Sequence, residues 1–216
     1  MYDFLDGLML GDGGIAVARD REKNSYFYIE VSGAIHMDWL RSIKKAFLEI
    51  GILISPTFPK VYSRSYHGRS YDACRLVTPR IPLFTQERLR WYVEDKGKYR
   101  KVVPRDLKLT PVTLAHWFIG DGCTAWCRGS VILTLYTNGF IDSDVAYLNS
   151  LLAEKGLPMH INRHHTGYGS ILTIAESNTV NKFLRLVEAF IPPSYQYKIK
   201  KSRYWDNDES TDKCFA

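Results

Sequence analysis

Residues 4–14 read FLDGLMLGDGG, and residues 114–123 read the related LAHWFIGDGC. Moving the first stretch forward by 109 positions lays Asp12 on Asp121 and Gly13 on Gly122. Each copy has apolar residues at i, i+3 and i+4 and an aspartate at i+7, which describes one face of a helix with a carboxylate at its C-terminal end. The repeat therefore predicts two similar helices, each ending in Asp-Gly.

These carboxylates stand at the unfavourable end of a helix, because the helix dipole favours cations there by roughly 0.3–1 kcal/mol. Two such acids at matching points of a duplicated unit indicate a paired site in which a cation holds each carboxylate. The alternative is that two core helices both end in Asp-Gly by chance, since this dipeptide is frequent in turns.

The composition is that of a soluble globular protein. Of the 216 residues, 45% are hydrophobic and 24% are charged. No apolar run reaches transmembrane length, and the N-terminus lacks a basic region followed by an apolar core. We therefore expect a soluble intracellular protein with no membrane partner, in a compartment that the sequence does not identify.

Cysteines and charge carry weaker signals. Four cysteines are too few for a disulfide framework in a chain of this length, and Cys123 and Cys127 lack a second ligand pair for zinc. Residues 1–108 hold 19 Lys and Arg against 13 acids, whereas residues 109–216 hold 10 of each. The excess indicates a polyanion partner, although a solvated surface explains it equally well.

Hydrophobic periodicity predicts the same order of elements in both halves. The first half is expected to form strands at 15–19 and 25–32, a helix from Asp38 to Gly51, strands at 57–63 and 71–78, and a helix at 86–94. The helix after Asp38 should bury Leu40, Ile43, Phe47 and Leu48.

In the second half Thr110 is a good helix N-cap, with Pro111 at the first helical position. Strands are expected at 124–128 and 130–137, a helix from Asp144 to Gly156, strands at 159–164 and 170–175, and a final helix with Val180, Phe183, Leu184, Val187 and Phe190.

Together these elements predict an α/β (α+β) fold of two αββαββα repeats, at 1–95 and 110–216, joined by a basic linker at 96–109. Hairpins give antiparallel sheets that carry helices on one face and leave the other polar.

Three roles fit a symmetric aspartate pair. Hard divalent cations such as Mg²⁺ bind carboxylates, and two metal sites can assist phosphodiester hydrolysis. An aspartic-protease dyad fits poorly, because its Asp-Thr/Ser-Gly loops sit on mostly β scaffolds, whereas these aspartates follow apolar helices. The third role is a helix-pair interface that binds nucleic acid without chemistry.

Both copies resemble the signature of the LAGLIDADG homing endonucleases in their single-chain, two-motif form. Copy one matches the consensus at Leu5, Gly7, Leu8, Asp12 and Gly13, and copy two at Leu114, Ala115, Asp121 and Gly122. The lead-in from Lys101 through Pro111 is also similar to this family. His116 departs from the pattern, because it stands where copy one has Gly7, and we interpret it as a hydrogen-bonded interface residue.

The resemblance implies that the motif helices pack side by side at a central interface and that the sheets form a DNA-binding saddle. It further implies that Asp12 and Asp121 bind two or three Mg²⁺ ions, with the carbonyls of Gly11 and Gly120 as further ligands. Family members often place a lysine near each site, and Lys101 and Lys198 match by context.

DNA reading is expected on the polar sheet faces, where Arg and Lys pair with guanine edges and phosphates. The candidates are Arg19, Arg21, Lys23, Tyr28, Glu30, Lys60, Arg64, Arg69, Arg75, Arg128, Thr134, Arg163, His165 and Tyr168. Lys200, Lys201 and Arg203 are expected to contact phosphate.

The resemblance implies a monomeric endonuclease that breaks both strands of a long double-stranded DNA site with Mg²⁺, as in intron homing. The alternative is a non-cleaving nucleic-acid-binding protein of the same fold, either a maturase that assists splicing of intron RNA or a DNA-binding regulator.

Overall fold

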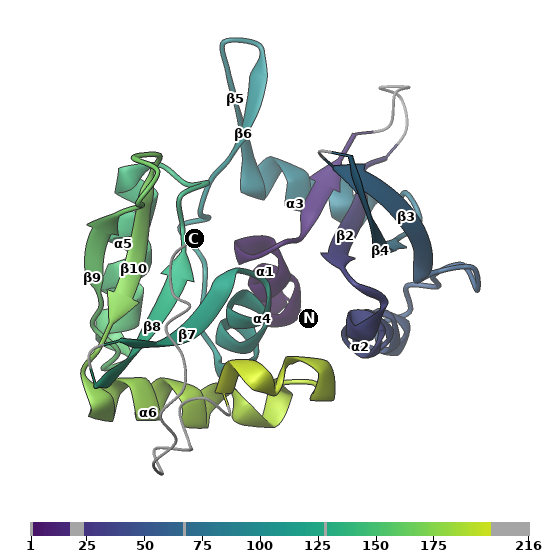
Figure 1. Ribbon diagram of the computed structural model, residues 1–216. Coiled ribbons are helices and arrows are strands. Elements are labelled where there is room, and N and C mark those ends of the chain that lie inside the picture. The colour runs from purple at the N-terminus through teal and green to yellow at the C-terminus, as the bar shows by residue number, and fades with distance from the viewer. Residues whose placement is uncertain (1, 18–23, 67, 128, 200–216) are drawn as a thin grey trace.

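The computed structural model describes residues 2–17, 24–66, 68–127 and 129–199. Two helices, α1 (Tyr2–Leu10) and α4 (Pro111–Asp121), pack against each other at the centre. A four-stranded antiparallel sheet lies on either side of this pair (Figure 1). The predicted α+β architecture with two sheet-and-helix repeats is therefore confirmed.

The two repeats have the same order of elements. The first sheet has the strand order β1-β2-β4-β3 and the second β7-β8-β10-β9. The first repeat contains β1 (Gly14–Ala16), β2 (Tyr26–Ser32), α2 (Met37–Glu49), β3 (Lys60–Tyr66), β4 (Arg69–Val77) and α3 (Pro82–Trp91). The second contains β7 (Gly122–Cys127), β8 (Ser130–Tyr136), α5 (Asp142–Glu154), β9 (His160–Arg163), β10 (Ser170–Ile174) and α6 (Ser177–Val187). Short 3₁₀ turns lie at Ala34–His36 (η1), Glu188–Phe190 (η2) and Pro193–Tyr195 (η3).

The helices bury the predicted stripes with two corrections. In α2 the buried face contains Trp39, Leu40, Ile43 and Phe47, whereas Leu48 is 55% exposed. The buried face therefore includes Trp39 in place of Leu48. Trp39 packs toward the central helices, where its indole N–H donates to His116. Helix α6 ends at Val187, so Phe190 lies in η2 and is 42% exposed.

Neither Asp38 nor Asp144 is the first residue of its helix, contrary to what the sequence predicts. Helix α2 begins at Met37 and α5 at Asp142, so both aspartates lie inside the first turn. Asp38 accepts hydrogen bonds from Ser194, and Asp144 accepts them from Val103 and Arg105. Segments far along the chain thus donate to carboxylates that lie in the first turns of these helices.

The predicted linker is partly folded. Strands β5 (Tyr92–Asp95) and β6 (Lys98–Lys101) form a hairpin that projects from the body (Figure 1). Lys96 and Gly97 form its turn with φ values of 50° and 75°, a conformation that glycine adopts without strain. The strand predicted at 15–19 is described only as β1, because residues 18–23 lie outside the described part. The division into 1–95, 96–109 and 110–216 stays a prediction.

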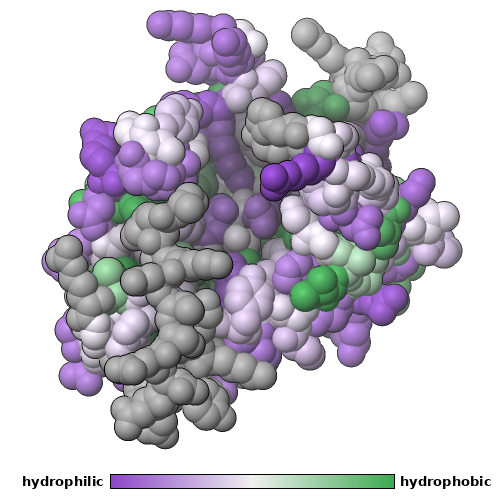
Figure 2. All heavy atoms as spheres, in the orientation of Figure 1, coloured by the Kyte–Doolittle hydropathy of each residue, from purple (hydrophilic) through white to green (hydrophobic). Residues whose placement is uncertain are grey.

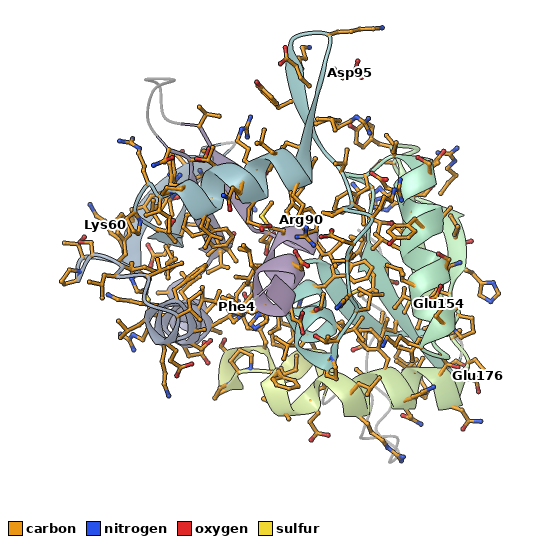
Figure 3. The ribbon with its side chains drawn as sticks, turned by 180° about the vertical axis from the view of Figure 1, so that it is seen from behind. Phe4, Lys60, Arg90, Asp95, Glu154 and Glu176 are labelled. Carbon is orange, nitrogen blue, oxygen red and sulfur yellow. The ribbon has the colours of Figure 1, made fainter. Side chains whose placement is uncertain are left out.

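A buried ion pair fastens α3 to α1. Arg90 donates from Nη2 to Oδ2 of Asp6 at 2.9 Å, and its side chain points toward α1 (Figure 3). Trp91 donates from Nε1 to the same carboxylate at 3.3 Å, and Glu87 and Asp106 also contact the guanidinium. Breaking a buried pair leaves an uncompensated charge, so this contact fixes α1 firmly against its repeat. Within the described residues, no helix is both long and apolar enough to cross a bilayer.

Candidate active site and nucleic-acid interface

The ends of the two central helices touch through glycine. A Cβ atom added to Gly120 would lie 2.9 Å from the amide nitrogen of Asp12 and 3.0 Å from Cα of Gly11. Any larger residue would therefore push the two backbones apart. This close approach brings together the residues that follow each glycine, Asp12 and Asp121.

His116 fills the helix interface on the N-terminal side of the contact between Gly11 and Gly120. A Cβ atom on Gly7 would lie 2.8 Å from Cβ of His116, so the histidine packs directly on the glycine of the other motif. Its Nδ1 accepts a hydrogen bond from Nε1 of Trp39 at 3.2 Å, and burial lowers its pKa to about 4. The interpretation of His116 as a hydrogen-bonded interface residue is confirmed.

The two carboxylates influence each other electrostatically. Burial raises the pKa of Asp121 to about 7, and the charge of Asp12 adds to the rise, while Lys101 and Lys198 oppose it. Burial also raises the pKa of Asp12, although part of its surface stays open to solvent. Neither carboxylate makes a hydrogen bond or ion pair with another residue of the described part. The arrangement thus leaves the oxygens of two neighbouring carboxylates open to other ligands at an accessible point.

A lysine lies beside each motif. Lys101 donates from Nζ to the carbonyl oxygens of Gly13 and Gly11, at 2.9 and 3.2 Å. Lys198 donates to the equivalent carbonyl of Gly122 at 2.6 Å and to two carbonyls of α4 at 2.7 and 3.2 Å. The two repeats therefore hold their lysines in the same way.

Burial lowers the pKa of both lysines to about 8, and the two aspartates oppose that shift. Among the opposing charges, Asp121 acts most strongly on Lys101, and Asp12 acts most strongly on Lys198. Each lysine thus contacts the backbone of one motif and neighbours the carboxylate of the other. The four predicted catalytic side chains form a single cluster.

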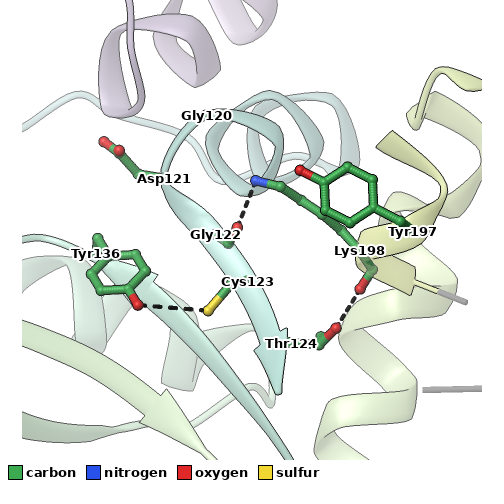
Figure 4. Close-up of a pocket in the computed structure, with 8 residues that line it drawn as sticks. All are labelled: Gly120, Asp121, Gly122, Cys123, Thr124, Tyr136, Tyr197 and Lys198. Carbon is green, nitrogen blue, oxygen red and sulfur yellow. Dashed lines mark hydrogen bonds between the residues drawn. The ribbon is translucent and has the colours of Figure 1, made fainter. Parts of the chain in front are cut away.

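A pocket opens next to Asp121 (Figure 4). It has a volume of about 420 Å³ and is lined by Gly120, Asp121, Gly122, Cys123, Thr124, Tyr136, Tyr197 and Lys198. Cys123 donates from Sγ to the hydroxyl of Tyr136 at 3.8 Å. In the first repeat the place of Cys123 is taken by Gly14, where a Cβ would lie 2.7 Å from the ring of Tyr28. In the first repeat the Tyr28 ring therefore lies where a side chain at position 14 would begin.

The first sheet presents six of the predicted DNA-contacting residues on one face. Phe27, Ile29, Val31, Cys74 and Leu76 face the core, so the alternate positions face outward. The outward set includes Tyr28, Glu30, Lys60, Arg64, Arg69 and Arg75. Glu30, Arg75 and Lys60 lie in one cross-strand row, and Arg75 stacks over Tyr28 at 5.1 Å.

The second sheet has a different outer face. Its outward positions are Cys123, Ala125, Cys127, Ser130, Ile132, Thr134, Tyr136, His160, Asn162, Ile171 and Thr173. Within the described residues this face carries no arginine, lysine or acid. Thr134 lies on it but is only 9% exposed, whereas Asn162 donates to Thr173 at 2.6 Å on the open surface.

The remaining predicted residues separate into two groups. Arg163 pairs across the sheet with Ser170 and reaches Asp142 at 3.1 Å, so the register places it on the helix side of the sheet. His165 and Tyr168 lie in the turn between β9 and β10. Arg19, Arg21, Lys23, Arg128, Lys200, Lys201 and Arg203 lie outside the described residues.

Figure 2 shows a hollow between the two halves with hydrophilic residues inside it. Sequence reasoning missed Tyr195, a buried residue whose ring centre lies 5.4 Å from Nζ of Lys198. The only sequence signal for Tyr195 is its place three residues before a predicted lysine, which does not distinguish it from its neighbours.

Comparison with known proteins identifies the fold and the family. The model of the LAGLIDADG DNA endonuclease family matches residues 2–183. The uncharacterized protein MJ1098 of Methanocaldococcus jannaschii is 32% identical over 198 residues, which are 91% of this chain and 72% of that protein. The cytochrome b mRNA maturase bI2 of Saccharomyces cerevisiae is 31% identical over 115 residues, half of this chain and 26% of that protein.

Among solved structures, the homing endonuclease I-WcaI bound to its DNA recognition sequence superposes with a TM-score of 0.74 at 26% identity, over 91% of this chain and 84% of that one. The LAGLIDADG homing endonuclease I-GzeII, in complex with its DNA target, shares the fold with a TM-score of 0.52 at 12% identity, over 92% and 87% of the two chains. The twin motifs, their contact through glycine and a family match over most of the sequence agree: the chain belongs to the LAGLIDADG DNA endonuclease family.

Proposed function

We propose that this protein is a site-specific endonuclease that breaks both strands of a double-stranded DNA target by Mg²⁺-dependent hydrolysis. The observation that carries the proposal is the cluster at the touching helix ends, where Asp12 and Asp121 lie between two equivalently held lysines. The likeness to I-WcaI, which is bound to its DNA recognition sequence, supports DNA as the partner.

The chemistry of the oxygen donors fits divalent cations. Mg²⁺ prefers carboxylates together with water and substrate phosphate, and it seldom has an all-protein cage. Within the described residues no group of three or more His, Cys, Asp or Glu side chains is placed to hold an ion, so the two aspartates leave room for other oxygens. Gly11 and Gly120 are proposed to add backbone carbonyls, and a carbonyl such as that of Gly11 can accept from Lys101 and still offer a lone pair.

Bound metal would stabilise charge on the attacking and leaving oxygens as water adds to phosphorus and the bond to the leaving sugar oxygen breaks. Asp12 and Asp121 would hold the ions and orient the scissile phosphates between the two sheets. Lys101 and Lys198 would place positive charge beside the reacting groups, because their ammonium groups are fixed by backbone carbonyls. Each lysine would serve one of the two strands.

Aspartate-to-asparagine variants test this assignment. Asp12→Asn and Asp121→Asn should each abolish double-strand cutting of the DNA that flanks the gene, while DNA binding stays largely intact. Loss of several kcal/mol of transition-state stabilisation corresponds to a rate decrease of at least about 100-fold. EDTA should have the same effect on the wild type, and Asp95→Asn, at the exposed hairpin tip, is the matched control.

Full cleavage by either variant would refute the metal assignment. Tight, salt-sensitive DNA binding by the wild type with no cut at any Mg²⁺ concentration would refute the endonuclease proposal and leave a DNA-binding protein.

A second candidate function is assistance to the splicing of intron RNA. The identity to the cytochrome b mRNA maturase bI2 over half of the chain favours it. The test is the rate of splicing of the host intron transcript with and without the protein. Acceleration that survives Asp12→Asn would support a maturase that does not depend on the nuclease site. We further propose that the protein acts on DNA as a monomer, because one chain supplies both motifs.

A further inference from the structure

Two aspartates occupy corresponding places in the repeats, and each accepts hydrogen bonds from a segment next to one of the two lysines. Asp38 lies in the first turn of α2, and Asp144 lies in the first turn of α5. Asp38 accepts hydrogen bonds from the backbone nitrogen of Ser194 at 2.9 Å and from its hydroxyl at 2.6 Å. Asp144 accepts from the backbone nitrogen of Val103 at 3.2 Å and from Nη2 of Arg105 at 2.8 Å.

Each of these contacts joins the two repeats. Ser194 belongs to the segment that follows the second repeat, four residues before Lys198, yet it binds an aspartate of the first repeat. Val103 belongs to the segment that follows the first repeat, two residues after Lys101, yet it binds an aspartate of the second. Each lysine-bearing segment is therefore held by a carboxylate from the opposite repeat.

On the Lys198 side, aromatic rings extend the contact from Asp38 to the ammonium group. His36 stacks on the ring of Tyr195 at 4.2 Å, and Trp39 meets the same ring edge-on at 5.3 Å. The Nζ of Lys198 lies 5.4 Å from the centre of that ring. Displacement of Ser194 would move Tyr195 and with it the surface on which Lys198 rests.

The Lys101 side has its own set of supporting contacts. Arg105 lies over the ring of Tyr147 at 4.5 Å, and the Tyr147 hydroxyl donates to the Arg105 carbonyl at 2.8 Å. Lys101 lies 5.9 Å from the ring centre of Phe140, just before α5. The second repeat thus holds the segment that begins with Lys101 through both Asp144 and aromatic side chains.

We propose that Asp38 and Asp144 are cross-repeat positioning residues: each fixes the lysine that serves the other repeat's motif, so neither cutting centre is complete without the opposite half. The inference rests on the proposed nuclease function for its effect on cleavage, but the positioning itself is a property of the folded protein. Because charge-assisted hydrogen bonds are the stronger ones and both carboxylates use two oxygens, each contact restrains its segment in more than one direction.

The first test measures positioning without any cleavage. Lysine amines of the metal-free protein are labelled with an amine-reactive reagent, and the rate at each lysine is read by mass spectrometry. In Asp38→Ala the labelling rate of Lys198 should rise at least about fivefold, while that of Lys101 stays unchanged. In Asp144→Ala the labelling rate of Lys101 should rise instead, while that of Lys198 stays unchanged.

The second test measures each DNA strand separately. With the two strands carrying different labels, Asp38→Ala should slow cutting of one strand, and Asp144→Ala should slow cutting of the other, each by at least about tenfold. Both variants should then accumulate nicked plasmid, with nicks in opposite strands. Ser194→Ala and Arg105→Ala remove one bond each from the segment side and should reproduce the two biases more weakly.

Glu176→Gln is the matched control, because Glu176 caps α6 by accepting from Asn178 and Thr179 and touches neither lysine segment. It should lower the melting temperature without changing either the labelling pattern or the strand bias. If Asp144→Ala does not fold, Asp144→Asn keeps the shape of the side chain and still removes the charge that binds Arg105.

Equal changes at both lysines, or equal slowing of both strands, would overturn the proposal and reduce the two aspartates to general stabilisers. If the labelling pattern is as expected but the wild type cuts no DNA, the positioning role stands and the nuclease proposal fails.

Discussion

At the residue scale, the main finding is a carboxylate that the fold keeps partly protonated near neutral pH. The pKa of Asp121 rises from its ordinary value of 3.8 to about 7, chiefly through burial and further through the charge of Asp12. A folded-state pKa above the unfolded one means that the folded protein binds the proton more tightly. Asp121 therefore contributes stability to the metal-free protein that is fully present below its unfolded pKa and is lost as the pH rises through about 7.

Asp121→Asn should for that reason stabilise the metal-free protein at pH 8, by on the order of 1–3 kcal/mol, because an amide carries no charge to desolvate. The difference should shrink at pH 4, where the wild-type carboxyl is also neutral. Calorimetric melting from pH 4 to 8 in EDTA measures it. A constant difference at all pH values would show that the charge of Asp121 is not the cause.

Cleavage should follow the same ionisation in the opposite sense, since only the ionised carboxylate holds Mg²⁺ well. Single-turnover rates should rise by about tenfold per pH unit below the pKa of Asp121 and level off above it. Saturating Mg²⁺ should move this rise to lower pH, because the metal competes with the proton. At subsaturating Mg²⁺, a rate that is independent of pH between 5 and 7 would contradict the assignment.

The site was predictable at this scale only where the repeat provided a signal. Asp12 and Asp121 stand in matching contexts, so the repeat marks both, whereas Lys101 and Lys198 were expected through the resemblance to the homing endonucleases. Asp38 and Asp144 also stand at corresponding positions of the two repeats, but an aspartate there is typical of any helix start and does not indicate a contact with another segment. Their contacts come from segments far along the chain, which no local pattern reveals.

At the element scale, the close packing of α1 against α4 depends on glycines at their interface. A Cβ atom at Gly7 would lie 2.6 Å from the carbonyl oxygen of Thr113, which is far inside van der Waals contact. The obstacle is backbone, so it cannot rotate away as the end of a long side chain does. Helices α1 and α4 therefore pack with their backbones in direct contact at this point.

Gly7→Ala should cost about 1–3 kcal/mol of stability, the usual penalty for overpacking a closed interface. Gly139→Ala is the control, because nothing lies within 4 Å of its added Cβ atom and its backbone is not left-handed. Chemical denaturation of both variants gives the comparison. Equal stability of the two would show that the helix pair tolerates a wider spacing.

The order of the elements was predictable at this scale, but several boundaries were not. Alternating and helical periodicities depend on burial against a neighbour, and this set the cores of both sheets and helices. The hairpin at β5 and β6 lacks such a signal because most of its residues, from Val93 to Tyr99, are exposed. The sequence instead predicted helix up to residue 94, whereas α3 ends at Trp91, and a linker from residue 96, because of its basic, polar composition.

At the scale of the whole molecule, the two sheets are alike in topology and unlike in chemistry. The outer face of the first sheet carries Lys60, Arg75 and Glu30 in one row, whereas the described part of the second outer face is uncharged. Charged groups contribute the salt-dependent part of DNA affinity, and neutral groups contribute contacts that salt affects little. The two halves of the DNA site should therefore be recognised by different interactions.

Lys60→Ala should weaken DNA binding and reduce the slope of log affinity against log salt by about 1, if Lys60 contacts a phosphate. Thr173→Val, on the second outer face, should leave that slope unchanged and affect only target variants altered in the other half-site. Fluorescence anisotropy over a salt series, with DNA variants of each half-site, measures both. Identical slopes for Lys60→Ala and the wild type would remove Lys60 from the interface.

The bond from Asp38 to Ser194 also bears on attempts to retarget the protein by fusing halves of different relatives. A hybrid that takes its second half from another chain would inherit a foreign tail, and that tail must present a donor to Asp38 where Ser194 now stands. Recombinants chosen only for compatible central helices would then bind their new sequences and leave one strand intact. Such a hybrid should therefore keep residues 193–198 of this chain together with its first half, in place of the corresponding residues of the foreign tail.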